Sequence, residues 1–340
     1  MSYSKLQELP PLWARFCLRH QDFMEMLTRQ SMQDKKVVLA LSGGADSMAL
    51  LRILHFLIPR TGLKLTAVHL NHMLRDNAQN DEKLAREQCL KLGIDFRAGH
   101  SRVASYARLT RTGTEEAARI LRYRFLFMEA ARRNADYVVT GHNLNDLAED
   151  VLMRLGRGAG WPGLAGMAGY DPGRKLLRPL LLTSREKITD FLENLGQVWS
   201  RDESNLDVSF SRNRVRHELV PLMKSIYPGF FRSVANLWKL GRMDEAYWAE
   251  VLEHSADKAL TGKDYYDHQT LSAMNQAARL RLYKQVLDRK GPGHVLFENL
   301  TELDRLWMQG RGGKVIRFPG RKFARIVQRG ILFGCDDQRG

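Results

Sequence analysis

Cysteine is scarce in this chain, and its scarcity excludes several kinds of site. Three cysteines, Cys17, Cys89 and Cys335, are spread over 340 residues and form no C-x-x-C pair. A disulfide framework, a zinc knuckle or a persulfide relay needs cysteines at short, regular spacings. We therefore expect apolar thiols in the core rather than reactive or metal-binding ones.

Long apolar runs are missing too. No segment reaches the ~18 apolar residues that cross a bilayer, and residues 1–10 do not combine a basic stretch with an apolar one, as a secretion signal would. The hydrophobic fraction of 44% and the charged fraction of 27% are typical of a soluble globular protein. We expect a cytosolic protein whose length favours two domains.

Acidic residues are outnumbered by basic ones. The chain has 53 Lys and Arg against 38 Asp and Glu, a net charge of +15. A cationic surplus of this size attracts polyanions, and nucleic acid is the first candidate. An anionic membrane surface is the alternative, but no basic amphipathic helix with an aromatic apolar face stands out.

Short apolar runs alternate with segments of helical period in the first part of the chain. This alternation predicts an α/β domain, in which helices cover both faces of a parallel sheet and ligands bind at the carboxyl ends of the strands. The expected strands are 35–41, 63–70, 95–100 and 136–140, and the expected helices are 47–57, 80–92, 114–133 and 144–155.

The strand signal fades after Tyr170. We expect a Ser-capped helix at 184–195, several amphipathic helices between 212 and 306, and short strands again within 314–333. A domain boundary is predicted near Pro221, so that residues 1–220 form one domain and residues 221–340 a mostly helical second one.

The strongest local signal is a loop that directly follows an apolar strand and directly precedes an apolar helix. Its glycines allow a sharp turn, and its amide groups and serine hydroxyls can face a phosphate. Asp46, an anion, would act through Mg²⁺ or by fixing the loop. An ordinary strand-to-helix turn is the alternative. The loop consists of Ser42, Gly43, Gly44, Ala45, Asp46 and Ser47.

This loop is not a Walker A sequence, because no Lys follows a glycine at the required position. It resembles the PP-loop of the N-type ATP pyrophosphatases, a family that splits ATP into AMP and pyrophosphate. The resemblance implies an adenylated intermediate, and it leaves amide ligases, base thiolases and lysidine synthetases as alternatives.

A carboxylate pair follows the fourth expected strand. Asp146 and Glu149 are three residues apart, so on a helix their side chains share one face. At the carboxyl edge of the sheet they could hold Mg²⁺, bind a substrate ammonium or take a proton from an attacking amine. Acidic capping of the helix N-terminus is the alternative.

Arg154 and Arg157 come on the next turns of the same helix, where guanidinium groups could bind phosphates. An internal ion pair with Asp150 is the alternative for Arg154. The string 158–163 fits G-x-G-x-x-G, but it follows a helix rather than a strand, which argues against dinucleotide binding.

Six further pieces, taken in order, resemble the tRNA(Ile)-lysidine synthetase family from about Lys35 to Pro221. They are Val68–Arg75, Glu116–Tyr123, Gly163–Met167, Arg178–Leu181, Asp202–Asn205 and Arg212–His217. The resemblance implies a ligase that converts the wobble cytidine of an isoleucine tRNA with a CAU anticodon into lysidine, using ATP, Mg²⁺ and free lysine. It leaves monomer and homodimer both open.

The resemblance also implies a doubly wound ATP-binding catalytic domain followed by a part that grips the tRNA. It carries over the 42–47 loop as the ATP site and Asp46, Asp146 and Glu149 as catalytic, metal or lysine-binding groups. Contacts to RNA or phosphate are implied for Arg119, Arg212 and Arg214. Many relatives have His-His where this chain has His142-Asn143, so an acid or base role at position 143 is in doubt.

Two other patterns complete the sequence picture. His69 and His72 could be taken for a metal pair, but no third ligand lies nearby in sequence, which favours a satisfied polar cluster. The stretch Arg311–Arg329 has seven basic and no acidic residues, interleaved with two phenylalanines. Such a strip, with Arg321 and Lys322 in it, could follow an RNA backbone.

Among rival functions, a base thiolase would need cysteines that this chain lacks, and an amide ligase would not need the basic surplus. A noncatalytic RNA-binding protein would leave the 42–47 loop unexplained.

Cytosine C2 becomes reactive once its oxygen is adenylated, and lysine must then lose a proton, for which Asp146 or Glu149 is the nearest acceptor. Asp146 is the preferred catalytic carboxylate.

Overall fold

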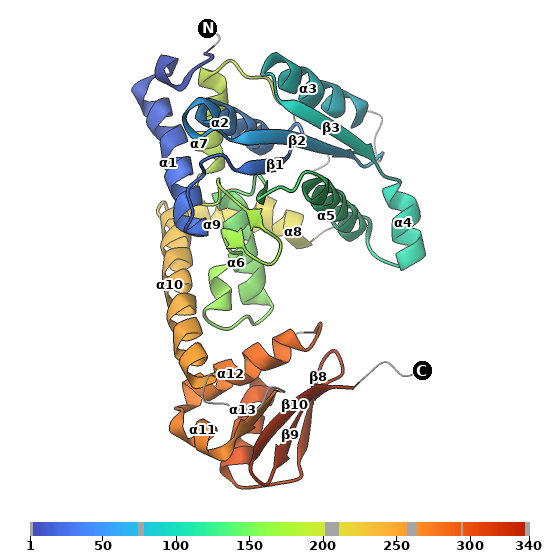
Figure 1. The fold of residues 1–340 in the computed structure, drawn as a ribbon, viewed down its shortest axis with the longest axis vertical. Helices are drawn as coiled ribbons and strands as arrows, with labels where there is room; N and C mark the ends of the chain where they lie inside the picture. Colours follow the sequence, from blue (N-terminus) through green and yellow to red (C-terminus); the bar gives the residue numbers. More distant parts are fainter. Residues whose placement is uncertain (1–2, 74–77, 201–210, 257–263, 294, 337–340) are drawn as a thin grey trace. The chain divides into compact units, whose positions relative to one another are not determined.

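The computed structural model describes residues 3–73, 78–200, 211–256, 264–293 and 295–336 (Figure 1). The described chain divides into two compact units. Unit 1 contains residues 1–159 and 165–238, and unit 2 contains residues 160–164 and 239–340. Of the segments that carry the family resemblance, residues 74–75 at the end of the first one and all of residues 202–205 lie outside the described residues.

A mostly parallel sheet forms the centre of unit 1, as the sequence predicts. Its strands lie in the order β3-β2-β1-β4-β6-β5, and only the edge strand β5 runs antiparallel. The chain builds β2 and β3 on one side of β1 and then returns to place β4 on its other side, so the order reverses between β1 and β4. The strands are β1 (Lys36–Ala40), β2 (Lys64–Asn71), β3 (Asp95–His100), β4 (Tyr137–Val139), β5 (Tyr170–Asp171) and β6 (Leu176–Leu177).

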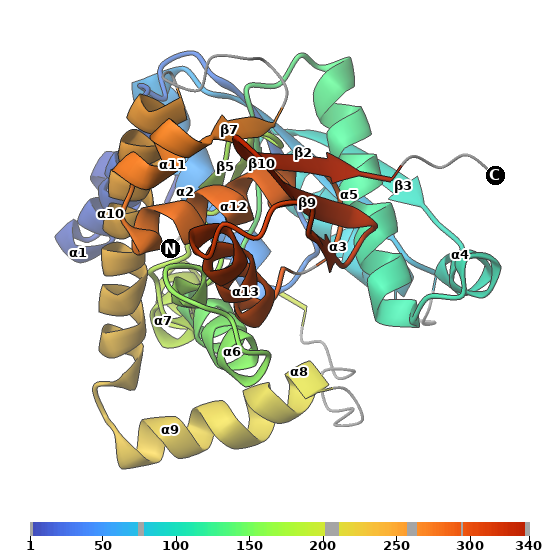
Figure 2. The ribbon, with the colours of Figure 1, turned by 90° about the horizontal axis from the view of Figure 1, so that it is seen from below.

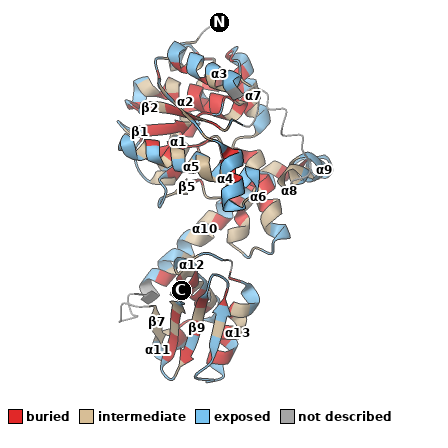
Figure 3. Cartoon of the chain, turned by 90° about the vertical axis from the view of Figure 1, so that its right-hand side faces the viewer, coloured by how far each residue is buried: buried red, intermediate tan, exposed pale blue. Residues whose placement is uncertain are grey.

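Helices cover both faces of this sheet. One face packs against the first three helices and α7, through a core that includes Leu39, Leu50 and Phe191. The other face packs against α5 through Val38, Val138 and Leu126, and the buried strands are visible in Figure 3. The helices are α1 (Pro11–Thr28), α2 (Ala45–Thr61), α3 (Ala78–Lys91), α4 (Val103–Thr110), α5 (Thr114–Arg132) and α7 (Arg185–Asn194), and a short turn, η1 (Leu6–Glu8), precedes them.

A further group of helices extends unit 1 beyond the sheet. Helix α6 (Leu144–Gly156) begins directly after β4 and packs its apolar side, Leu147 and Val151, on Phe230 and Trp238. The turn η2 (Gly163–Ala165) follows the glycine loop. Helix α8 (Ser211–Arg214), the π-helical turn η4 (Val215–Leu219) and α9 (Val220–Ile226) form one continuous rod (Figure 2), and α10 (Phe230–Ala256) comes next.

Unit 2 has its own core. A four-stranded antiparallel sheet, in the order β7-β10-β9-β8, packs one face on three helices through residues such as Leu282, Tyr283, Trp307 and Ile331. Its elements are β7 (Tyr265–Asp267), α11 (His268–Ala273), α12 (Gln276–Arg289), α13 (Phe297–Met308), β8 (Val315–Phe318), β9 (Lys322–Val327) and β10 (Gly330–Cys335).

The two units divide at residues 238 and 239, within helix α10. The expected boundary, Pro221, lies inside unit 1, because α9 and the first turns of α10 share an apolar cluster with α6 through Val220, Phe230 and Val234. No helix in the described parts of the chain is long and apolar enough to span a membrane.

Candidate active site

The 42–47 loop lies at the carboxyl end of β1 and leads into helix α2. Gly43 has φ +90°, a conformation that residues with a side chain rarely adopt. Ser47 Oγ donates to the carbonyl of Gly44 at 3.0 Å and accepts from the amide of Ser42 at 3.1 Å, which closes the loop. The amide of Ser200 donates to the carbonyl of Gly43 at 2.9 Å. The first amides of α2 have no helical acceptors and are suited to an anion.

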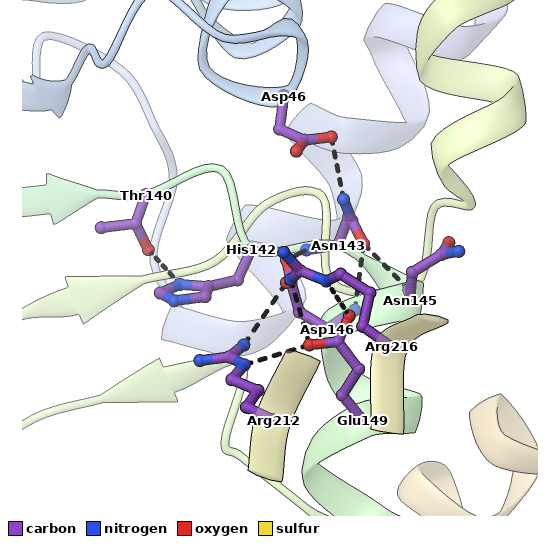
Figure 4. A network of polar contacts seen from close by, with 9 residues as sticks. All are labelled: Asp46, Thr140, His142, Asn143, Asn145, Asp146, Glu149, Arg212 and Arg216. Carbon is purple, nitrogen blue, oxygen red and sulfur yellow. Dashed lines mark hydrogen bonds and ion pairs between the residues drawn. The ribbon is translucent and has the colours of Figure 1, made fainter. Parts of the chain in front are cut away.

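The loop after β4 meets this first loop at the point where the strand order reverses. A Cβ atom on Gly141 would lie 3.0 Å from the carbonyl carbon of Asp46 and 3.1 Å from the amide nitrogen of Ser47. Two residues later, Nδ2 of Asn143 donates to Oδ1 of Asp46 at 2.8 Å (Figure 4). Reversal points of this kind are where open α/β sheets bind ligands.

Asn143 also begins helix α6. Its Oδ1 accepts from the amides of Asn145 and Asp146 at 2.8 and 3.1 Å, while Oδ2 of Asp146 accepts from the amide of Asn143 at 3.0 Å. This reciprocal capping box fixes the first turn of the helix. The helix therefore presents Asp146 and, one turn later, Glu149 at the same edge of the sheet as Asp46.

Two arginines from the α8–η4 rod bind the carboxylate pair, as Figure 4 shows. Arg216 Nε lies 2.6 Å from Oε1 of Glu149, and its Nη2 lies 3.0 Å from Oδ1 of Asp146. Arg212 Nε lies 3.0 Å from Oε2 of Glu149, and its Nη2 lies 3.5 Å from Oδ1 of Asp146. The Glu149 side chain is only 3% exposed, so these guanidinium groups supply the compensating charge that burial requires.

A neutral histidine lies beside this cluster. Burial first, and then the guanidinium groups of Arg178, Arg212, Arg122 and Arg119, lower the pKa of His142 to about 3. Its Nδ1 is 2.8 Å from Oγ1 of Thr140. On strand β2, Nδ1 of His69 donates to the carbonyl of Leu41 at 2.8 Å. The side chain of His69 is therefore held by the backbone directly after β1.

The other arginines singled out from the sequence have varied surroundings. Arg119 is exposed and lies over the ring of Tyr123. Arg154 Nε lies 2.8 Å from Oδ2 of Asp150, which is the internal ion pair considered as its alternative. Arg157 ends helix α6 at the surface. Arg214 points away from the carboxylates and pairs with Glu218 at 3.2 Å.

The basic stretch of unit 2 was expected to face solvent, but only some of its basic side chains are exposed. Lys322 is fully buried, and its ammonium donates to the carbonyls of Gly291 and Gly293 at 3.2 and 2.8 Å, so it cannot also contact RNA. The expectation for this residue was wrong because Lys322 points to the inner face of β9. Arg321 and Arg325 are exposed, and Arg325 lies over the ring of Phe323.

The surroundings of Asp46 fit a magnesium ion that is bound mainly through a substrate. Within the described residues no three His, Cys, Asp or Glu side chains come together as a metal site of their own. Magnesium is commonly held by one or two carboxylates together with substrate phosphates. Burial, followed by the charge of Asp146, raises the pKa of Asp46, and a bound cation would offset both effects.

Arg216 is the site residue that the sequence reasoning missed. It belongs to the segment Arg212–His217, but only the first and third residues of that segment were selected. Its partners lie 67 and 70 positions away in the chain. The cue available in the sequence was the spacing of Arg212 and Arg216, which share one helical face.

Sequence comparisons give a consistent result. A family model described as PP-loop domain matches residues 18–223. A tRNA(Ile)-lysidine synthase of Nitratidesulfovibrio vulgaris is 41% identical over 315 residues, which are 87% of this chain and 91% of that protein. One from Geobacter sulfurreducens is 36% identical and covers 80% of this chain, which spans 59% of its length. One from Petrotoga mobilis is 32% identical, with coverages of 68% and 76%.

A solved structure shares the fold. The U34-tRNA thiolase NcsA from Methanococcus maripaludis, solved with its iron–sulfur cluster, superposes with a TM-score of 0.56 at 20% identity, covering 67% of this chain and 79% of that one. At this identity the likeness concerns the fold alone. In this chain Cys17 and Cys89 are buried, and burial raises the pKa of both thiols to about 12.

Proposed function

Since this chain belongs to the PP-loop domain family and, within it, to the tRNA(Ile)-lysidine synthases, we propose that it joins lysine to C2 of the wobble cytidine of an isoleucine tRNA with a CAU anticodon. The reaction consumes ATP, passes through an adenylated cytidine and gives lysidine, AMP and pyrophosphate. The chain is thus a ligase of tRNA modification.

One observation carries this proposal. The ATP loop and the carboxylate pair come from different parts of the sequence, yet they meet at one edge of the sheet and are joined by the 2.8 Å hydrogen bond between Asn143 and Asp46. A two-step ligase needs this arrangement, because the group that is activated by ATP must then meet the amine without leaving the site.

In the first step the O2 atom of the cytosine attacks the α-phosphorus of ATP, and the bond to the departing pyrophosphate breaks. The amides and hydroxyls of residues 42–47 hold the phosphates, and they act where negative charge develops. Magnesium at Asp46 would neutralise charge on the pyrophosphate. Arg119, Arg154 and Arg157 are further candidates for contacts with phosphate or RNA, although Arg154 would first have to leave Asp150.

In the second step the ε-amine of lysine attacks C2, the C2–O bond breaks and AMP leaves. Free lysine is mostly protonated at neutral pH, because the pKa of its ε-ammonium in water is ~10.4, so it must lose a proton first. We assign that proton to Oδ1 of Asp146, which is more exposed than Glu149. Glu149 would hold the ammonium group or the arginines in place.

Arg212 and Arg216 form ion pairs with both carboxylates. Arriving phosphates of ATP or tRNA compete for the same guanidinium groups, which would release the carboxylates for lysine. Arg214, exposed on the same rod, is a candidate for a tRNA contact, and so are the exposed arginines of β8 and β9 in the second, tRNA-gripping part of the chain.

The experiment separates the two steps. Protein, Mg²⁺, radiolabelled ATP and isoleucine tRNA without lysine should release pyrophosphate and leave AMP on the RNA. Lysine should then free the AMP and make the anticodon fragment heavier by lysine less one water, as measured by mass analysis of the digested tRNA.

Three outcomes would contradict this assignment. Pyrophosphate release at an equal rate without tRNA would indicate an amide ligase acting on a small substrate. A mass gain that ignores lysine and requires a sulfur donor would indicate a thiolase. A protein that binds tRNA but never consumes ATP would indicate a noncatalytic RNA-binding protein.

A further inference from the structure

We propose that Asn143 is a positioning residue, whose side-chain amide holds the carboxylate of Asp46 in the orientation that ATP activation requires. The same side chain begins the helix that carries Asp146 and Glu149, so one residue connects the ATP loop with the carboxylate pair. This inference rests on the proposed function, because that function places Asp46 at the ATP phosphates.

The neighbours of Asn143 fix the orientation of its amide group. Its Oδ1 faces two backbone N–H donors, those of Asn145 and Asp146. A flipped amide would direct its NH₂ group at two donors and its oxygen at the carboxylate of Asp46, and both contacts would be repulsive. The NH₂ group must therefore face Asp46.

The bond that results is well shielded. Asn143 is 2% exposed, and among the described residues it is the sole hydrogen-bond donor to the Asp46 carboxylate. Water competes poorly with a buried donor, so the amide constrains the rotation of the carboxylate more strongly than a surface contact would. Gly141 supports this geometry, because it lets the two loops approach within van der Waals contact.

The two tasks of Asn143 require different chemical groups. Helix capping needs only a short side-chain acceptor, which Ser, Thr or Asp would also supply. The bond to Asp46 needs a donor on a second atom that reaches the carboxylate while the first atom accepts from the helix amides. Neutral Asn carries such a pair of atoms, whereas Ser and Thr have a single hydroxyl that lies one bond closer to the backbone. Capping alone therefore does not account for Asn at this position, and a substitution that retains the cap can isolate the second task.

The first test uses Asn143→Ser, which keeps a capping hydroxyl but has no donor at the position of Nδ2, because the serine oxygen lies one bond closer to the backbone. The melting temperature should stay within about 3 °C of the natural protein, since serine caps as well as asparagine. The kcat for tRNA-dependent pyrophosphate release should fall between about tenfold and about a hundredfold, as expected for a lost hydrogen bond to a charged group. The KM values for tRNA and lysine should stay unchanged, because the proposal places Asp46 at the phosphates of ATP.

Asn275→Ser is the matched control. Asn275 caps helix α12 by accepting from the amide of Ala278 at 2.9 Å, in the same way as Asn143 caps α6, but it is part of unit 2. This variant should keep both its melting temperature and its rate of pyrophosphate release. A loss of rate equal to that of Asn143→Ser would mean that any weakened cap impairs the enzyme, which would overturn the proposal.

The second test does not depend on activity. In protein labelled with ¹⁵N at asparagine, the side-chain NH₂ signal absent from Asn143→Ser, or from Asn143→Asp if the serine variant does not fold, belongs to Asn143. It should exchange slowly with solvent in the natural protein and quickly in Asp46→Ala. Continued protection in Asp46→Ala would show that the amide does not depend on Asp46, which would overturn the proposal.

The outcomes also distinguish this inference from the proposed function. If the natural protein makes lysidine and Asn143→Ser does so at the same kcat, the positioning role is wrong and the function is unaffected. If the natural protein makes no lysidine, the proposed function fails, while the exchange measurement still decides whether Asn143 holds Asp46.

Discussion

Three histidines of unit 1 are held neutral by their surroundings. Burial is the largest cause for each, and it lowers the pKa of His20 and His72 to about 4 and that of His142 to about 3. His20 is satisfied as a neutral ring, with Nδ1 donating to the carbonyl of Phe16 at 2.7 Å and Nε2 2.9 Å from Oγ1 of Thr183. Because these buried rings are neutral in the folded protein, low pH should destabilise unit 1.

The pH dependence of stability follows from His20. Its pKa in the folded state, about 4, is below the ordinary value of 6.5, so the unfolded chain takes up the proton first as the pH falls. Stability is therefore complete above pH 6.5 and is lost toward pH 4, by about 1.4 kcal/mol per pH unit within that window.

His20→Gln should remove this contribution, so that its urea midpoint falls less between pH 7 and pH 5 than that of the natural protein. The exposed His268, changed to Gln, serves as the control and should leave the pH dependence as it is. An equal loss in the natural protein and in His20→Gln would contradict the assignment.

At the scale of elements, the rod formed by α8 and η4 presents two faces with different roles. Arg212 and Arg216 point to the carboxylates of α6, whereas Arg214 faces outward to Glu218. The rod thus contributes two arginines to a partly buried ion-pair cluster and a third, Arg214, to an exposed ion pair.

Arg216→Ala and Arg214→Ala separate these two faces. The loss of Arg216 leaves the buried Glu149 with fewer donors and should reduce the free energy of unfolding by about 1–3 kcal/mol. Arg214→Ala removes an exposed pair and should leave the free energy of unfolding nearly unchanged. Urea unfolding of both variants measures this difference, and equal effects would show that the cluster does not stabilise the rod.

The second sheet presents an open face that follows strand alternation. Lys322, Ala324 and Ile326 of β9 point to the core, while Phe323 and Arg325 point away from it, and Arg317 of β8 pairs with Phe323 in register. Arg317 also forms an ion pair with Asp336 at 2.6 Å.

Reversing the charge of Arg317 and Arg325 to Glu should weaken tRNA binding without changing ATP affinity. For every phosphate that the protein no longer neutralises, the slope of log affinity against log salt should become shallower by about 0.7 to 0.9. Lys284→Glu, on helix α12 at the other face of the sheet, is the control and should bind tRNA nearly as the natural protein does. Unchanged affinity in the double variant would place the RNA elsewhere.

Strands β1 to β4 and helices α2, α3 and α5 were predicted to within a few residues, because buried parallel strands read as continuous apolar runs between turn signals. Helix α4, between β3 and α5, was not predicted. The structure places the predicted Asp46, Asp146 and Glu149 at one sheet edge. Helix α1 was not predicted, although its buried Trp13, Phe16, Cys17 and Met24 follow a helical period. The sequence does not show which face of β9 is buried, because each of its two faces carries one basic residue.

At the scale of the whole molecule, two separate cores share one chain. Residues such as Leu39 and Phe191 form the core of unit 1, and residues such as Leu303 and Ile331 form that of unit 2. A buried Arg279–Asp304 ion pair, with Tyr283 donating to the same carboxylate, lies in unit 2 alone. We therefore expect each unit to respond separately to heat and to ligands.

Calorimetry with and without ATP and Mg²⁺ tests this independence. Two heat-absorption transitions are expected, and a ligand at about a hundred times its Kd should stabilise only the one belonging to unit 1, by about 2.7 kcal/mol. The Arg279→Ala variant should lower only the other transition, which assigns the two. A single transition that moves as a whole in both experiments would show that the units unfold together.

The close approach of Gly141 to the ATP loop has an evolutionary consequence. Any side chain at that position, or a residue inserted into either loop, would separate Asp46 from Asn143, so the lengths of both loops should be inherited unchanged. By contrast, Gly156 at the end of α6 and Gly160 in the glycine loop that follows have no atoms within 4 Å of an added Cβ and no positive φ. Heritable variation between lineages should therefore accumulate in that glycine loop, while the two loops at the sheet edge change together or not at all.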